Sequence, residues 1–328
     1  MKRQKPKKSG ETVPAKGRIL FFDIIRILCV AAIVYVHSDF DLIPWFNQFF
    51  FADGYGPFNI YSKGLQGFAV YGMIFVSGAV LEYNYQGLEK LTGYLQFLFK
   101  RFIRLYPAFW MSLIVAIVLF PAILLQKSIA DIVLEFTGFS IAFGQGPGFI
   151  NPMGWFIGTI FLLYILFPWF SAVIRKYRWG ALLGFCILSW GLRSLILTYT
   201  IIPLDRFWMW FPLCNAFEFC LGIYIIQTGW YPKNENNYPL VQTLSDLSFY
   251  VFLFHTIVGT AFVVYLVQPL GAFDLALAMN NQVIGFTLFY LQRFASILLV
   301  SWIAMLADSR IRNWILQRDP VRHFLTKN

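Results

Sequence analysis

Long apolar runs alternate with short polar stretches along this chain. Eight of the runs are about twenty residues long, which is the length that a helix needs to cross roughly 30 Å of hydrocarbon. The pattern therefore predicts an all-α fold, a polytopic transmembrane helix bundle of about eight spans, or of nine or ten if weaker segments also cross. The predicted spans are 19–38, 66–83, 105–126, 154–173, 179–200, 207–227, 245–267 and 283–307.

The composition supports a membrane protein over a soluble one, because 59% of the residues are hydrophobic and only 13% are charged. We expect one transmembrane domain, 19–307, between two basic cytoplasmic tails, 1–18 and 308–328. The expected location is the cell membrane, which the chain crosses several times.

The distribution of basic residues predicts the topology. With the N-terminus in the cytoplasm, twenty of the 26 Lys and Arg residues lie on the inner side of the predicted spans. Cytoplasmic loops are enriched in these residues, so both termini are predicted to be cytoplasmic. The apolar segment 131–143 is too short to cross and is interpreted as interfacial or re-entrant. If it did cross, the basic turn 175–178 would face outward, against this rule.

The net charge of +10 includes a cluster of basic residues at positions 2–8, directly before the first span. Membrane lipids are the expected partner of such a cluster, and no nucleic acid is expected. The four cysteines lie in predicted spans without a CxxC pair, and only three histidines are present, so no metal site is predicted. Nothing in the pattern specifies an oligomeric state.

The first predicted span carries three polar residues on one face. Asp23, Arg26 and His37 fall within about 60° of one another at 100° per residue. Charged residues inside a bilayer cost roughly 2.5–3.5 kcal/mol each and commonly mark a working site. Asp23, Arg26 and His37 are therefore the candidate catalytic residues of this span. Asp23 lies one turn before Arg26, where it can pair with it, and a structural role is the alternative interpretation. A histidine near a span end can also be merely interfacial.

A second polar cluster precedes the third predicted span. Arg101 and Arg104 are three residues apart, so on a helix their guanidinium groups point to nearly the same side. Two such groups suit bidentate phosphate binding. Ordinary cytoplasmic anchoring is the alternative interpretation of the same pair.

Several motifs, in order along the chain, resemble those of the acyltransferase 3 family of integral-membrane O-acyltransferases. Phe22-Asp23-Ile24-Ile25-Arg26 followed by His37 resembles the Arg-x10-His signature, and Arg101-x-x-Arg104 with Tyr106-Pro107 resembles the Arg-x-x-Arg signature. The other matches are Phe75-Val76-Ser77-Gly78, Gly154-Trp155-Phe156-Ile157 with Tyr164 and Pro168, and the run Ser248 to His255. Many family members carry a Glu after the element that corresponds to Gly154-Trp155-Phe156-Ile157. Gly158, Thr159 and Ile160 follow here, so no role of that Glu can be transferred to this chain.

The resemblance implies transfer of an acyl group, usually acetyl, from acyl-CoA on the cytoplasmic side to a hydroxyl of a glycan, a lipid-linked sugar or a related acceptor. In this interpretation His37 is the general base, because a neutral imidazole accepts a proton near pH 7. Arg101 and Arg104 bind the CoA phosphates, and Arg26 supplies positive charge along the donor path. Arg26 and His37 are about 16 Å apart along a regular helix, so a long donor would run past one toward the other.

Other polar residues within predicted spans are secondary candidates. His255 lies midway through its span, where we expect a cavity or a hydrogen-bond partner. Glu218 is expected to neutralise one of two buried arginines, Arg193 or Arg293. A structural ion pair is the alternative interpretation of these three charged residues.

Two other functions compete with acyl transfer. An exporter or flippase of polysaccharide or glycolipid would also carry buried Arg, Glu and His residues, but it would more readily show inverted repeats or broken helix pairs, which the sequence lacks. A scaffold in a glycan-synthesis complex would leave Arg26, His37, Arg101 and Arg104 without a role.

Overall fold

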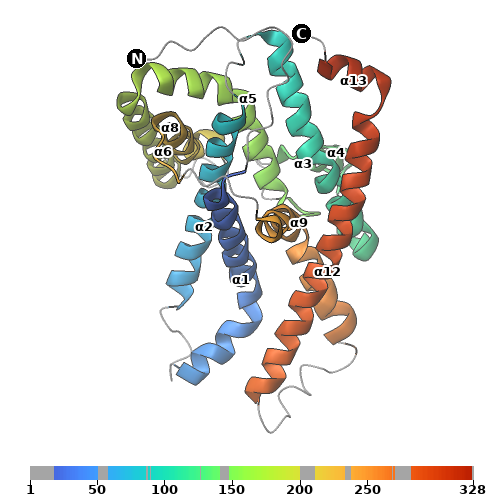
Figure 1. Cartoon of the computed structure of the whole chain (residues 1–328). Coiled ribbons are helices and arrows are strands. Elements are labelled where there is room, and N and C mark those ends of the chain that lie inside the picture. The colour runs from blue at the N-terminus through green and yellow to red at the C-terminus, as the bar shows by residue number, and fades with distance from the viewer. Residues whose placement is uncertain are drawn as a thin grey trace.

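The computed structural model of the chain is built of helices connected by loops (Figure 1). It describes residues 18–50, 58–85, 88, 90–125, 127–140, 148–199, 211–232, 238–267, 269 and 282–326. Within these ranges no strand is present. The side chains of 38–50 and of several residues at other helix ends lie outside the description, as do the basic cluster at 2–8 and most of the loop that follows the first helix.

The main helices differ widely in length. They are α1 (Leu20–Phe50), α2 (Phe58–Asn84), α3 (Leu91–Leu119), α4 (Ile129–Thr137), α5 (Gly154–Tyr177), α6 (Trp179–Tyr199), α8 (Ala216–Thr228), α9 (Pro239–Phe262), α12 (Gln282–Leu316) and α13 (Asp319–Thr326). Short helical turns join them at η1 (Pro121–Leu124), η3 (Pro212–Asn215) and η4 (Val263–Val267).

Six helical segments in the described part of the chain are long and apolar enough to cross a membrane. They are Leu20–His37, Leu91–Leu119, Gly154–Tyr177, Trp179–Thr198, Pro239–Leu266 and Leu291–Leu316. The chain is therefore an all-helical, multi-pass membrane protein. The predicted span 207–227 overlaps α8, which has 13 residues and covers only about 20 Å at 1.5 Å per residue. The count of eight spans and the cytoplasmic termini stay predictions.

The boundaries of two helices, α3 and α4, can be compared with the segments that the sequence predicts. The third span was expected to begin at 105, but α3 begins at Leu91 and ends at Leu119. Three cations, Lys100, Arg101 and Arg104, interrupt the apolar run without interrupting the helix, so the hydropathy pattern placed the start too late. Most of the described part of segment 131–143 belongs to α4, which runs from Ile129 to Thr137 and at nine residues is too short for a span.

The helices pack in a row that runs α6, α8, α2, α1, α9 and α12. Helix α5 packs against α6, α8 and α2, and α3 packs against α9, α12 and α5. Figure 1 shows α6 and α8 on one side of α1, and α12 on the other side beyond α9. The outward faces carry large apolar side chains such as Leu28, Val118, Ile187 and Leu299, which suit contact with lipid. The middle of the row, between α1 and α9, is where polar side chains gather.

Helices α2 and α8 approach each other closely because each presents a glycine at the crossing. A Cβ on Gly78 would lie 2.0 Å from the Phe219 carbonyl oxygen, and one on Gly222 would lie 2.1 Å from the Phe75 carbonyl oxygen. Small residues allow this kind of backbone approach between membrane helices. Gly78, the last residue of the motif Phe75-Val76-Ser77-Gly78, therefore has a packing role.

Candidate active site

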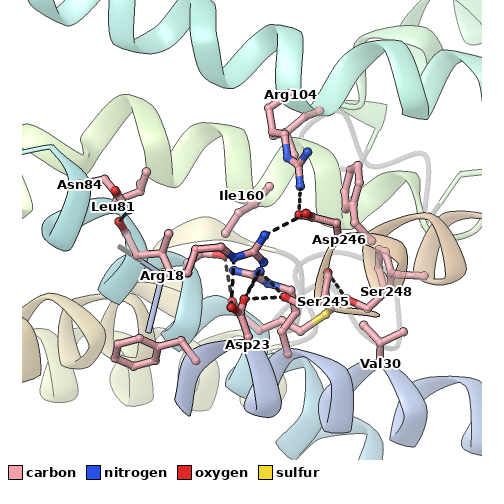
Figure 2. A pocket seen from close by; sticks show the side chains of 18 of the residues that line it. Arg18, Asp23, Val30, Leu81, Asn84, Arg104, Ile160, Ser245, Asp246 and Ser248 are labelled. Carbon is pink, nitrogen blue, oxygen red and sulfur yellow. Dashed lines mark hydrogen bonds and ion pairs between the residues drawn. The ribbon is translucent and has the colours of Figure 1, made fainter. Parts of the chain in front are cut away.

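A cavity of about 270 Å³ lies among α1, α2, α3, α5 and α9. Its polar lining comes mainly from α1, α3 and α9 and from Arg18, which precedes α1 (Figure 2). Its apolar wall includes Val30, Met73, Ile160 and Phe252. The cavity therefore combines a charged side with an apolar side.

Asp23 is the first anchor of the charged side. It is 5% exposed, and its carboxylate accepts hydrogen bonds from Arg18 Nε at 3.0 Å and Arg18 Nη2 at 2.7 Å. Arg26 Nη1 lies 3.4 Å from the same carboxylate, which is the pair expected from the i, i+3 spacing. Ser245 Oγ donates to Asp23 at 2.6 Å and accepts from Arg26 Nη1 at 2.8 Å, so it joins α9 to α1.

Asp246 is the second anchor and links three parts of the chain. Arg18 Nη1 donates to its Oδ2 at 2.8 Å, and Arg104 Nη2 donates to its Oδ1 at 3.0 Å. Figure 2 shows Arg18 and Arg104 converging on this carboxylate. The residue before α1, helix α3 and helix α9 therefore meet at one acidic group.

The cavity is suited to an anionic ligand. Four guanidinium groups line it, from Arg18, Arg26, Arg101 and Arg104, against two carboxylates. Burial disfavours the charged form of Arg18, but its hydrogen bond to Asp23 and the attraction of both carboxylates outweigh this and raise its pKa. The lining thus carries an excess of two positive charges, held beside apolar surface where electrostatic interactions are weakly screened.

Arg101 is held by aromatic rings. Its guanidinium carbon lies 4.7 Å from the ring centre of Tyr85, 5.9 Å from that of Phe97 and 6.0 Å from that of Tyr164. Its Nε is buried and has no hydrogen-bond partner among the described residues. Cation–π contacts hold the group in place while its N–H donors remain available for a ligand.

All five sequence motifs contribute to this one cavity. With the motifs numbered in the order in which they occur along the chain, the lining includes Arg26 of the first, Ser77 of the second, Arg101 and Arg104 of the third, Tyr164 of the fourth and Ser248 of the fifth. These residues are separated by up to 222 positions in the sequence. The motifs therefore form one site rather than several.

The two candidate histidines face each other farther along the same two helices. His37 Nδ1 lies 3.2 Å from His255 Nε2, and the ring centres are 5.0 Å apart. His255 is 3% exposed and His37 is half-buried. The hydrogen-bond partner expected for His255 is therefore His37.

Backbone carbonyls assign the protons of this pair. His37 Nδ1 is 2.8 Å from the Ile33 carbonyl oxygen, and His255 Nδ1 is 2.8 Å from that of Phe252. A carbonyl can only accept, so each neutral ring carries its hydrogen on Nδ1 and its lone pair on Nε2. The lone pair of His255 then faces the Nδ1–H of His37, and the basic atom of His37 is Nε2.

His37 does not line the cavity, in contrast to the expected continuous path from Arg26 to His37. Phe252 and Phe156 both line the cavity, and the ring centre of Phe252 lies 6.3 Å from that of His255 and 5.0 Å from that of Phe156. Both phenylalanines are buried. Phe252 therefore borders both the charged cavity and the histidine pair.

The other buried charged residues that the sequence analysis singled out, Glu218, Arg193 and Arg293, lie away from the cavity. Glu218 accepts from Arg193 Nη2 through both carboxylate oxygens at 2.9 Å, so Arg193 is the arginine that it neutralises. Arg193 also stacks on Tyr71, 4.6 Å from the ring centre. This pair joins α6 to α8 and is not part of the cavity lining. Arg293 packs against α9, where a Cβ on Gly259 would lie 2.9 Å from its Nη2.

Sequence reasoning missed three residues of the charged network. Arg18 was assigned to the basic tail, and Ser245 and Asp246 precede the run that was recognised as a motif. A basic residue five positions before Asp23 is a usable signal, but the pairing of Arg18 with Asp246 spans 228 positions and leaves no local trace. In the described part of the chain, no group of His, Cys, Asp and Glu could hold a metal ion.

Comparison with known proteins gives one match. A family model described as an acyltransferase domain matches residues 19–240, which is about two thirds of the chain. No curated protein and no solved structure matches the chain. The matched range contains the motifs on α1, α2, α3 and α5 and ends just after α9 begins.

Proposed function

The chain belongs to the acyltransferase 3 family, and from that premise we propose that it moves an acyl group, acetyl first among the candidates, from acyl-CoA to a hydroxyl of a glycan or lipid-linked sugar in the cell membrane. The observation that carries this proposal is the convergence of all five motifs on one cationic cavity. The helices α1 and α9 that supply Arg26 and Ser248 also supply the histidine pair.

The donor occupies the cavity in this proposal. The CoA phosphates bind Arg101 and Arg104, whose N–H groups form charge-assisted hydrogen bonds with phosphate oxygens. The pantetheine arm lies along the apolar wall beside Val30 and Phe252, past Arg26. Asp23 holds Arg26 and Arg18 in place and is a positioning residue, because its carboxylate is already engaged by both.

His37 acts as the general base. Its Nε2 takes the proton from the acceptor hydroxyl while the hydroxyl oxygen attacks the thioester carbonyl carbon. The tetrahedral intermediate then breaks its carbon–sulfur bond, and the departing thiolate receives the proton from His37. The products are an ester on the acceptor and CoA with a free thiol, so protons and electrons balance.

His255 supports His37 during this step. When His37 is protonated, its Nδ1–H donates toward both the Ile33 carbonyl and the His255 lone pair. Two acceptors on that side stabilise the imidazolium and keep Nε2 aimed at the acceptor, which is the role of the orienting partner in other catalytic histidine systems. Phe252 and Phe156, both buried, turn aside to let the thioester reach His37, and this gating motion is a step of the catalytic cycle.

The experiment that tests the function is acetyl transfer from radiolabelled acetyl-CoA to a membrane glycan extract, with purified protein in liposomes. Wild type, His37→Ala and His323→Ala are compared. His323 is an exposed histidine on α13, so its variant controls for the loss of an imidazole as such. Thermal melting in the same lipid shows whether each variant is folded.

Label on the glycan with wild type and His323→Ala, but not with folded His37→Ala, is the expected result. Transfer by His37→Ala at the wild-type rate would overturn the assignment of the base. If the wild type neither transfers label nor binds acetyl-CoA, acyl transfer is wrong, and transport of the glycan becomes the function to test.

A further inference from the structure

A second cavity, of about 300 Å³, adjoins the first and shares Arg101 and Arg104 with it. It is bounded by α3 and by the C-terminal part of α12. Its four cationic side chains belong to Lys100, Arg101, Arg104 and Arg312, and its lining, among the described residues, includes no carboxylate. The arginine pair of the third motif thus forms the boundary between two ligand-sized spaces.

Arg312 is held firmly at the wall of this second cavity. Its Nε forms an ion pair with Asp308 Oδ2 at 2.7 Å, and its Nη2 donates to the Tyr250 hydroxyl at 3.3 Å. Tyr250 in turn donates to Asp308, which is fully buried. This anchor on α9 and α12 fixes the guanidinium before any ligand arrives, so little conformational entropy is lost on binding.

The wall that carries Arg312 is docked onto α3. On α13, which follows α12, the Phe324 carbonyl accepts from Gln96 Nε2 at 2.8 Å, and the Phe324 ring packs edge-on against Phe99 with centres 5.8 Å apart. Figure 1 shows α13 at the same end of the molecule as the start of α3. These contacts hold the two walls of the second cavity at a fixed spacing.

We infer that the second cavity holds the 3′-phosphate of the CoA donor and that Arg312 selects CoA over 3′-dephospho-CoA. This inference rests on the proposed function. A ligand bound through its diphosphate at Arg101 and Arg104 extends into both cavities, since those arginines line both. The acyl arm takes the cavity with the apolar wall, and the nucleotide end takes the cavity with the cationic one.

The charge in the second cavity fits a phosphomonoester. Such a group carries about 1.5 to 2 negative charges near pH 7, more than each phosphate of a diphosphate linkage. Lys100 and Arg312 line only the second cavity and add two cationic groups to the shared arginines, while Asp308, which pairs with Arg312, does not line it. The guanidinium of Arg312 offers paired N–H donors that match phosphate oxygens, and Lys100 contributes a mobile charge. Arg312 lies outside the matched range 19–240, so the family match assigns it no role.

The test is the ratio of affinities for CoA and 3′-dephospho-CoA, measured by calorimetry on the full chain in phosphatidylcholine nanodiscs, which contain no anionic lipid. Wild type, Arg312→Gln and Arg310→Gln are compared. Arg310 is exposed on the same helix and does not line the cavity, so its variant removes the same charge from α12. We expect the wild type to bind CoA with about tenfold or more higher affinity than 3′-dephospho-CoA, because a charge-assisted hydrogen bond contributes a factor of this size to affinity.

Arg312→Gln is expected to lose most of this preference by weakening CoA alone, while Arg310→Gln keeps it. An unchanged ratio in folded Arg312→Gln, or equal weakening of both ligands, overturns the inference and leaves the proposed function standing. Failure of the wild type to bind either ligand overturns the proposed function itself. If Arg312→Gln does not fold, Lys100→Gln, an exposed position in the same cavity, must reduce the ratio for the inference to hold.

Discussion

Helices α1 and α9 meet at two places, and the two contacts differ in character. Near their N-terminal ends the contact is ionic: Asp23, Arg26 and Ser245 form a connected network, and Asp246 extends it to Arg18 and Arg104. Eleven residues farther along α1, the contact is between His37 and His255, each ring also bound to a backbone carbonyl. Phe252 lies between the two contacts.

The difference indicates that the two contacts between these helices suit two different steps, ligand binding and proton transfer. The ionic contact borders a cavity and holds more cations than carboxylates, which suits binding of an anionic donor. The histidine contact holds its protons in defined positions beside buried aromatic rings, which suits proton transfer. Substitutions at the two places should therefore change different kinetic constants.

Loss of the His37 imidazole should give the largest effect. His37→Ala is expected to lower kcat for acetyl transfer by about 10²- to 10⁴-fold, the usual range for a general base, with KM for acetyl-CoA changed little. Steady-state transfer at varied acetyl-CoA measures both constants. A raised KM with an unchanged kcat would mean that the histidine contact belongs to donor binding and would remove the contrast between the two places.

The second-largest effect should come from Arg101→Ala/Arg104→Ala, and it should fall on binding. Each lost charge-assisted hydrogen bond weakens CoA binding by about tenfold or more, so the double variant should bind about 100-fold more weakly. Calorimetry with CoA measures this. Arg310→Ala/Arg318→Ala removes two exposed arginines and should bind CoA like the wild type, and equal weakening in both doubles would point to net charge rather than to the cavity.

A smaller effect is expected at His255, for which we propose the role of accepting a hydrogen bond from His37. His255→Phe keeps an aromatic ring and removes the acceptor, so kcat should fall about tenfold, the cost of an unmet buried hydrogen bond. His255→Gln offers a carbonyl oxygen and should retain more activity. The comparison is of kcat at saturating acetyl-CoA, and equal losses in the two variants would mean that packing, not hydrogen bonding, is what His255 contributes.

The smallest effect should come from Asp246→Asn, and it has the opposite sign. Its carboxylate engages Arg18 and Arg104, and these side chains are 34–38% exposed, so the ion pairs are weak. Removing the negative charge leaves Arg104 more available to phosphate, and CoA binding should tighten up to about fivefold. Weaker binding in this variant would show that Asp246 positions Arg104 for the donor instead of competing with it.

Much of the fold could be predicted because it depends on local patterns. Apolar run length located the six helical segments that are long and apolar enough to cross a membrane, and the apolar stretch of the short α4 was recognised as too short for a span. The start of α3 was missed, since Arg101 and Arg104 interrupt the apolar run but point into a cavity rather than ending the helix. Hydropathy averages the polarity of all residues in a segment, so it cannot distinguish a polar stripe that faces inward from the end of a span.

The site was predictable where partners lie on one helix and unpredictable where they lie far apart. Asp23 and Arg26 are three residues apart, so their pairing follows from helix geometry. The contact of His37 with His255 joins residues 218 positions apart, and only the fold brings them together. Asp246 was overlooked for a related reason, because a polar residue near the start of a span looks ordinary until its two distant arginines are known.

The ring pair Phe252 and Phe156 has a consequence for the cell's ion gradients. A polar channel running the length of α1 and α9 would let protons or small ions leak down the membrane voltage, which drives each charge with about 2.3 kcal/mol per 100 mV. Phe252 and Phe156, two buried hydrocarbon rings on the side of the cavity nearest His255, offer no ligands to a permeating ion. A membrane protein with a charged cavity at one end of this helix pair and two histidines at the other can thus keep hydrocarbon between its two polar regions.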